Sequence, residues 1–247
     1  MEPVLLYGVP AGSSMGLIAA LEWLGKPYRL CRVDMLGEMR TPAYARINAR
    51  HETPVLITEA GRPLTETMAI AAWLEARDDQ RRISFEPLSP AADRMHQMLG
   101  FINTGFTASF SPLWAALEMS PPDPQMQDCL RRYGRPAVIE RHDKLEAMLD
   151  DRPYLAGEHP TLADAVLVGV ARWLEYHQVE RVQRWPKLAR LRARLEADPA
   201  VQFALAIENG GPHSASRYCR GQILLADVIA QFGTDATSPN PNPGLLG

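Results

Sequence analysis

The spacing of apolar residues changes once along this chain, near residue 80, and this change limits the possible folds more than any other feature. The residues before it alternate short apolar runs with segments of helical spacing, in the order β-α-β-α-β-β-α. After a charged and proline-containing stretch at 78–90, every apolar segment has helical spacing. The sequence therefore predicts an α/β domain followed by an all-α domain.

The same spacing places the individual elements. In the first domain we predict strands at 4–7, 28–33, 55–58 and 62–64, and helices at 14–24, 41–47 and 67–76. In the second we predict helices at 91–117, 126–149, 163–177 and 186–197, with an added terminal helix at 213–232. The predicted divisions are a first domain at 1–78, a linker at 79–90, an all-helical domain at 91–233 and a flexible tail at 234–247.

Composition excludes several classes of function. The net charge is −3 and the charged residues are interspersed, so we expect no nucleic-acid partner. No apolar run approaches 18 residues and no leader pattern precedes the first strand, which predicts a cytoplasmic protein without a membrane partner. The three cysteines are widely spaced, as expected of reduced thiols, and the histidines form no metal-binding pair, so we expect no metal.

Glu66 and Thr67 lie where the last predicted strand of the first domain gives way to a helix. The start of a helix presents free backbone N–H groups and the positive end of the helix dipole, which suit a carboxylate. A carboxylate side chain beside them suits an ammonium group. The pair is therefore typical of a site for the head of an amino acid, such as the γ-glutamyl end of glutathione, although an ordinary helix start is the alternative.

Four motifs, in order and spacing, carry a family resemblance. They are LYGVPAGSS at 6–14, Asn48 with TPVL at 53–56, LTETMAI at 64–70, and YLAGEHPTLADA at 154–165. Over residues 4–210 the chain resembles the glutathione S-transferase family, most closely its bacterial beta class. The resemblance implies a thioredoxin-like N-terminal domain, a helical C-terminal bundle, glutathione as co-substrate and a homodimer.

Glutathione-binding residues follow from this resemblance. It implies a cis bond before Pro54, which would turn the backbone of Thr53 toward the cysteinyl residue of glutathione. Glu66 and Thr67 would hold the γ-glutamyl head. A plain trans bond before Pro54 is the alternative, because sequence alone does not fix the isomer.

Ser13 and Ser14 stand where the family places its activating residue, at the start of the first helix. Lowering the pKa of a thiol by two units requires about 2.7 kcal/mol. A hydroxyl hydrogen bond to a thiolate contributes about 1.5–3 kcal/mol and a helix N-terminus about 0.3–1 kcal/mol. A serine can therefore activate bound glutathione without ionising itself, although both serines could instead be simple N-caps.

The electrophile side departs from the beta class. Ser13 replaces the usual cysteine, and Thr107-Ala108 replaces a histidine-lysine pair. Gly100 and Gly105 replace an asparagine and a glutamate, which we expect to open space for a bulkier apolar ligand. We predict that this ligand contacts the side chains Phe106, Thr107, Phe110, Trp114 and Trp173.

The predicted function is transfer of glutathione to a small hydrophobic electrophile, as in detoxification. The lost cysteine, histidine and lysine leave a second hypothesis, a non-catalytic protein of the same fold that binds a ligand or partner. A third is glutathione-dependent isomerisation or dehalogenation, for which serine sites also serve. Product analysis separates an isomerase from a conjugating enzyme, because only the isomerase regenerates glutathione.

Overall fold

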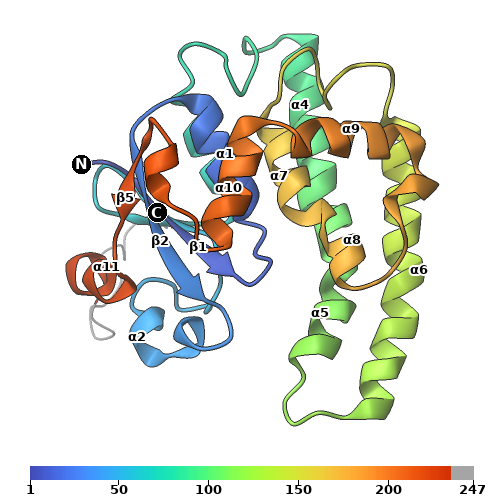
Figure 1. Cartoon of the computed structure of the whole chain (residues 1–247), viewed down its shortest axis with the longest axis horizontal. Coiled ribbons are helices and arrows are strands. Elements are labelled where there is room, and N and C mark those ends of the chain that lie inside the picture. Colours follow the sequence, from blue (N-terminus) through green and yellow to red (C-terminus); the bar gives the residue numbers. More distant parts are fainter. Residues whose placement is uncertain (235–247) are drawn as a thin grey trace, which may run out of the picture.

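A five-stranded mixed sheet forms the centre of the first domain. The structure is a computed structural model that describes residues 1–234 (Figure 1). In the sheet order β4-β3-β1-β2-β5, the strands are β4 (Pro63–Thr65), β3 (Val55–Ile57), β1 (Val4–Val9), β2 (Tyr28–Asp34) and β5 (Cys219–Gln222). Strand β1 runs parallel to β2 and β2 parallel to β5, whereas β3 and β4 are antiparallel to their neighbours. The predicted strands of the first domain are thus present, and β5 is an addition.

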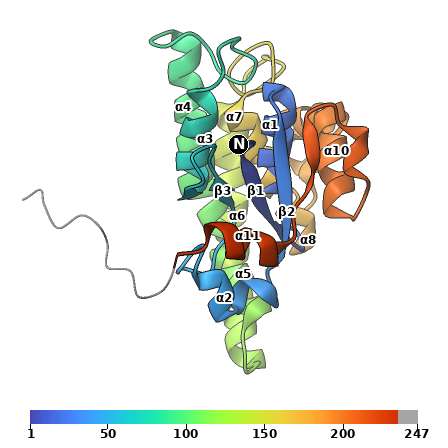
Figure 2. The same cartoon turned by 90° about the vertical axis from the view of Figure 1, so that its left-hand side faces the viewer.

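Both faces of this sheet are covered. Strand β1 is buried along its whole length, and its alternate side chains enter two separate apolar clusters. Helices α1 (Met15–Leu24) and α3 (Thr67–Glu75) contribute to the cluster on the inner face, toward the second domain. Helices α2 (Pro42–Ala45) and α11 (Leu225–Phe232) contribute to the cluster on the outer face, where they lie side by side (Figures 1 and 2).

Helices build the second domain. They are α4 (Pro90–Phe101), α5 (Ser111–Glu118), α6 (Pro124–Met148), α7 (Leu162–Ala171), α8 (Trp173–Tyr176), α9 (Pro186–Glu196) and α10 (Pro199–Glu208). Short 3-10 turns lie at η1 (Glu38–Arg40), η3 (Thr107–Phe110), η4 (Val182–Arg184) and η5 (His213–Ala215). In Figure 1 the 25-residue α6 runs beside α4 and α5. No helix in the part of the chain that the structure describes is both long and apolar enough to cross a membrane.

Side-chain caps explain where several helices begin. Ser89, Asp123 and Asp198 each accept hydrogen bonds from the first amides of α4, α6 and α10, and proline follows each of them at the first helical position. The predicted capping box forms at α7, where the carboxylate of Asp164 accepts from both the N–H and the hydroxyl of Thr161. Asp164 also accepts from the Leu155 N–H, and so ties the preceding loop to α7.

Three predictions about helices are wrong. The segment 163–177 is not one helix, because a turn at Arg172 separates α7 from α8. The segment 91–117 is not one helix, because a five-residue π-helix, η2 (Ile102–Phe106), and η3 interrupt it. The segment 213–232 contains η5, the strand β5 and only then α11. In β5 side chains alternate between buried and exposed, and Gly221 has φ +110°, which is unsuited to a helix. These residues complete the first domain rather than the second, and of the predicted tail 234–247 only Thr234 is described.

Candidate active site

A cleft of about 460 Å³ lies between the two domains. Its first-domain wall consists of the loop after β1, Met35 just after β2, the loop before β3 and the turn between β4 and α3. Its second-domain wall comes from α5 and α8. The cleft contains seven of the residues predicted from the sequence, namely Ser13, Thr53, Pro54, Glu66, Thr67, Trp114 and Trp173. Four separate segments of the first domain and helices of the second thus converge on one site.

The structure separates the two candidate serines. Ser14 is 1% exposed, and its Oγ accepts a hydrogen bond from the Gly8 N–H at 2.9 Å, which fixes the end of β1 to the start of α1. It caps no amide of α1. Ser13 is half-buried and lines the cleft beside the first turn of α1. Of the two serines, Ser13 is therefore the one that lines the cleft.

The second domain holds the loop that carries Ser13. The indole Nε1–H of Trp173 donates to the Ala11 carbonyl at 2.7 Å, and Arg172 Nη2 donates to the Gly12 carbonyl at 2.8 Å. Arg172 is itself paired with Glu208 at the end of α10, on two guanidinium nitrogens. Two consecutive carbonyls of the loop are thus fixed by neighbouring side chains of the other domain.

Close helix packing supports the same arrangement. A Cβ added to Gly169 of α7 would lie 2.2 Å from the Ser13 carbonyl oxygen, and one added to Gly16 would lie 1.8 Å from the Ala165 carbonyl oxygen. Neither position has room for a side chain, so α1 and α7 approach at backbone distance. The position of Ser13 is consequently determined by the interface between the domains as well as by α1.

The peptide bond between Thr53 and Pro54 is cis, as the resemblance implied. Thr53 lies just before β3, and its hydroxyl donates to the Met35 sulfur at 3.5 Å. The preceding carbonyl, that of Glu52, accepts from the Tyr44 hydroxyl at 2.8 Å and from Asn48 Nδ2 at 2.9 Å. Buried groups of the first domain therefore fix the backbone immediately before Thr53.

Glu66 has an unusual backbone and an unexpected partner. Its φ of +72° is rare for a residue other than glycine, and it stands just before α3, whose first amides lack partners within the helix. Arg50 Nη2 donates to Glu66 Oε1 at 2.6 Å and to the Thr65 hydroxyl at 3.0 Å, while Arg50 Nε donates to Glu52. The site therefore contains a cation next to the carboxylate. The sequence did not indicate Arg50, because it lies in an irregular loop where spacing does not show which way a side chain points.

The second-domain wall is aromatic. The rings of Trp114 and Trp173 meet edge to face, with centroids 5.2 Å apart, and Tyr176 stacks on Trp114 at 5.4 Å. His177 lies against Trp114 at 4.6 Å, and burial lowers the pKa of His177 to about 4. In the described part of the chain, Trp114 Nε1 and His177 Nε2 are buried without a hydrogen-bond partner. This wall suits an apolar ligand.

Three residues predicted for the electrophile pocket lie elsewhere. Phe106 and Phe110 are 0% exposed in the core of the second domain, where both rings pack on His142. The Thr107 hydroxyl donates to the Ile102 carbonyl across η2. The expected space at Gly105 is taken up by the Arg141 guanidinium, 3.1 Å from the position of an added Cβ. The π-helix shifts the helix phase, so these residues turn away from the cleft.

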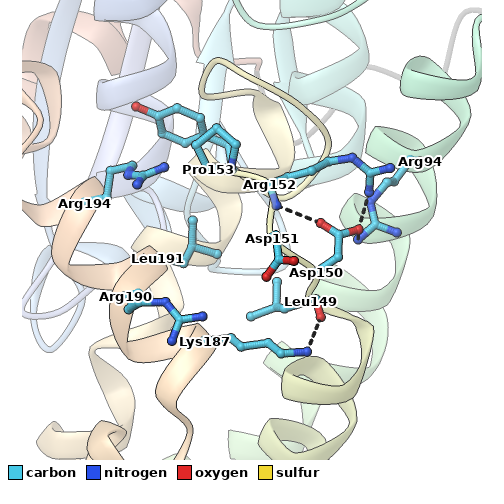
Figure 3. Close-up of a pocket in the computed structure, with 11 residues that line it drawn as sticks. Arg94, Leu149, Asp150, Asp151, Arg152, Pro153, Lys187, Arg190, Leu191 and Arg194 are labelled. Carbon is cyan, nitrogen blue, oxygen red and sulfur yellow. Dashed lines mark hydrogen bonds and ion pairs between the residues drawn. The ribbon is translucent and has the colours of Figure 1, made fainter.

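A second, smaller cavity of about 170 Å³ lies in the helical domain, between α4, the segment after α6, and α9 (Figure 3). Lys187 donates to the Leu149 carbonyl at 2.7 Å, and Arg94 bridges the carbonyls of Met148 and Leu155. Arg94 also pairs with Asp150 at 3.2 Å. This cavity contains none of the predicted site residues, and its bonds hold neighbouring segments together.

Comparison with known proteins agrees with this geometry. Residues 14–77 match the N-terminal domain of glutathione S-transferases and residues 119–199 match their C-terminal domain. The chain is 26% identical over 203 residues to glutathione S-transferase GST-4.5 of Xanthomonas campestris, covering 82% of this chain and 98% of that protein. It is 26% identical over 196 residues to maleylacetoacetate isomerase of Pseudomonas aeruginosa, covering 78% and 90%.

A solved glutathione S-transferase from Xylella fastidiosa superposes with a TM-score of 0.74 at 25% identity, covering 84% of this chain and 99% of that one. A thioredoxin-like domain, a helical domain and a cleft between them define a thiol-peptide-binding class of protein. Within that class, this chain belongs to the glutathione S-transferase family. Among the described residues, no three metal-ligating side chains form a group that could hold a metal ion.

Proposed function

We propose that this protein binds glutathione in the cleft, stabilises its thiolate through Ser13, and transfers it to a small hydrophobic electrophile. The observation that carries the proposal is the convergence of Ser13, Thr53, Glu66 and Thr67 on one cavity with an aromatic wall opposite. Nucleophilic attack by the thiolate on an electrophilic carbon forms the new C–S bond and expels the leaving group, or adds to an activated double bond.

Each wall has a distinct part in this proposal. Thr53 offers backbone groups to the cysteinyl residue of glutathione, and the amides at the start of α3, with the Thr67 hydroxyl, donate hydrogen bonds to its α-carboxylate. Glu66 holds the ammonium, sharing its carboxylate with Arg50. Trp114 and Trp173 offer apolar surface to the electrophile. A cytoplasmic homodimer, with the first domain of one subunit against the second domain of the other, completes the proposal.

The test is an ultraviolet difference titration of glutathione bound to the protein, following the thiolate band against pH. A midpoint well below the ordinary thiol pKa of about 8.5 supports activation by Ser13. Binding with an unshifted midpoint supports the non-catalytic hypothesis. No binding contradicts the proposal.

Ser13→Ala is expected to raise the pKa of the bound thiol by about one to two units and to leave the Kd for glutathione largely unchanged. The matched control is Ser14→Ala, which removes the acceptor for the Gly8 N–H and should lower thermal stability. A raised thiol pKa in Ser14→Ala but not in Ser13→Ala would contradict the assignment.

The isomerase relative favours one alternative reaction, glutathione-dependent isomerisation of an unsaturated acid. In that reaction the thiolate adds reversibly to a conjugated double bond and leaves after rotation about the carbon–carbon bond. Product analysis distinguishes the two. Glutathione is consumed one for one in conjugation and is regenerated in isomerisation.

A further inference from the structure

The C-terminal segment 219–234 covers the outer face of the first domain. It lies beyond residue 199, where the match to the family's C-terminal domain ends. Strand β5 extends the sheet beside β2, and α11 then crosses the outer face next to α2 (Figure 2). This segment is therefore part of the domain that forms the polar wall of the cleft, although it is the last part of the chain that the structure describes.

Helix α11 contacts β2 and shares an apolar cluster with residues of α2 and of the loop that follows it. Leu225, Val228 and Ile229 are buried in one apolar cluster with Tyr44 and Ile47. Beyond α11 the chain is bonded to the end of α2: the Thr234 N–H donates to the Arg46 carbonyl at 2.9 Å, and the Thr234 hydroxyl donates to it at 3.2 Å. Apolar packing and backbone hydrogen bonds thus hold the same short helix.

From that helix, contacts lead directly to the cleft. The Tyr44 ring is 0% exposed in the cluster beneath α11, and its hydroxyl donates to the Glu52 carbonyl at 2.8 Å. Asn48, one turn further on, donates to the same carbonyl and also accepts from the Arg50 N–H at 3.1 Å. Asn48, Arg50, Glu52 and Thr53 all line the cleft.

Helix α2 has little to hold it in place by itself. It comprises four residues, far fewer than an isolated helix needs for stability in water. Only Tyr44 of its residues is buried, and the loop after it carries a non-glycine residue with positive φ, His51 at +56°. The conformation of this loop consequently depends on what packs against Tyr44 and Ile47.

We propose that the C-terminal segment acts as a clamp that holds α2 and the loop 46–53 in the glutathione-binding conformation. Tyr44 is the positioning residue that connects the clamp to Glu52 and Thr53. This inference rests on the proposed glutathione site and adds that residues at the far end of the chain set the affinity of that site.

The test is the double variant Val228→Ala, Ile229→Ala in the full chain, with calorimetric titration of glutathione and amide hydrogen exchange. Both substitutions remove packing from the cluster that contains Tyr44 and Ile47, so amides at 41–53 should exchange faster. If the ordered fraction of the loop falls to about a tenth, the Kd for glutathione rises about tenfold. The pKa of the bound thiol should stay unchanged, because Ser13 stands at the start of α1, which belongs to the other apolar cluster.

Tyr44→Phe is a milder second variant that keeps the packed ring and removes only the hydrogen bond to Glu52. It should raise the Kd about two- to fivefold. The matched control is Leu188→Ala, Leu195→Ala, which empties part of the second-domain core, where both side chains are 0% exposed. The control should lower thermal stability and leave the Kd unchanged.

Each outcome decides one question. Faster exchange at 41–53 with an unchanged Kd overturns the positioning role, and so does an equal rise in Kd in the control. Unchanged exchange overturns the clamp itself. If the unaltered protein binds no glutathione, the proposed function fails, while the exchange experiment still decides whether the segment orders the loop.

Discussion

The two walls of the cleft differ in chemistry and in what holds them. The first-domain wall is ionic and hydroxylic: Arg50 links Glu66 and Glu52, and Thr67 begins α3 beside them. The second-domain wall is aromatic. The Trp173 indole N–H of this wall donates a hydrogen bond to the Ala11 carbonyl of the first domain.

In the proposed function, this difference gives the two domains separate tasks. A zwitterionic peptide needs paired charges and free amides, which the first-domain wall supplies. An apolar electrophile needs uncharged surface, which Trp114 and Trp173 supply. Because Arg172 and Trp173 also fix the loop before Ser13, the second domain would influence thiol activation in the proposed reaction.

The largest expected effect tests the ionic wall. Glu66→Gln should raise the Kd for glutathione roughly ten- to hundredfold, because a charge-assisted hydrogen bond to the ammonium is lost. Calorimetric titration measures it. Glu118→Gln is the matched control, since Glu118 lines the opposite wall, pairs with Arg40 at 3.5 Å and should leave the Kd unchanged. An equal rise in the Kd for glutathione in both variants would contradict the different roles of the two walls.

An intermediate effect concerns the core behind the aromatic wall. Burial lowers the pKa of His142 to about 4, so between pH 6.5 and 4 the unfolded chain binds a proton that the folded protein does not. The free energy of unfolding should therefore fall by about 1–2 kcal/mol from pH 7 to pH 5 through this residue. Denaturant titration at each pH gives the free energy of unfolding of the protein and of His142→Gln. The slope of that free energy against pH is then compared between the two proteins.

That comparison separates the contribution of His142 from that of Asp164, whose pKa shift has the opposite effect on stability. Burial raises the pKa of Asp164 to about 6, which favours the folded state as the pH falls below that value. Asp164 is common to both proteins, so its contribution cancels. Identical slopes of the free energy of unfolding against pH in the two proteins would show that His142 is not held neutral in the core.

The smallest expected effect sharpens the role of the aromatic wall. Trp173→Phe keeps an aromatic ring and removes the hydrogen bond to the Ala11 carbonyl, so the loop before Ser13 loses about 1 kcal/mol of support. The bound thiol should show a pKa higher by about half a unit, with an unchanged Kd for glutathione. Trp114→Phe is the control, because Trp114 Nε1 has no hydrogen-bond partner among the described residues. A larger shift in Trp114→Phe would contradict the positioning role of Trp173.

Much of the first domain could be predicted because its elements carry local signals. Alternating or continuous apolar runs predicted β1 to β4. Gly25, a residue type that commonly ends helices, predicted the end of α1. The family resemblance of the TPVL motif at 53–56 predicted the cis bond before Pro54. β5 carried no such signal: its residues, Cys219 to Gln222, include a glycine and no β-branched side chain, and the strand exists because β2 offers an edge.

The site was predicted less completely because some of its residues depend on tertiary geometry. The sequence placed both serines at one helix start, and only the hydrogen bond from Gly8 shows that Ser14 faces inward. Phe106 and Phe110 have helical spacing, but the π-helix that turns them into the core depends on packing around η2. Arg50 lies in an irregular loop, where spacing does not reveal which way a side chain points.

The position of β5 has a consequence for how the chain is made. A ribosome releases the first four strands early, but the edge of β2 and the apolar outer face stay uncovered until residues 219–232 emerge. At ordinary elongation rates that interval is on the order of ten seconds. During it the nascent chain presents a free strand edge and an open apolar surface, which are the features that chaperones bind and that promote aggregation. Completion of the N-terminal domain thus follows synthesis of the whole helical domain.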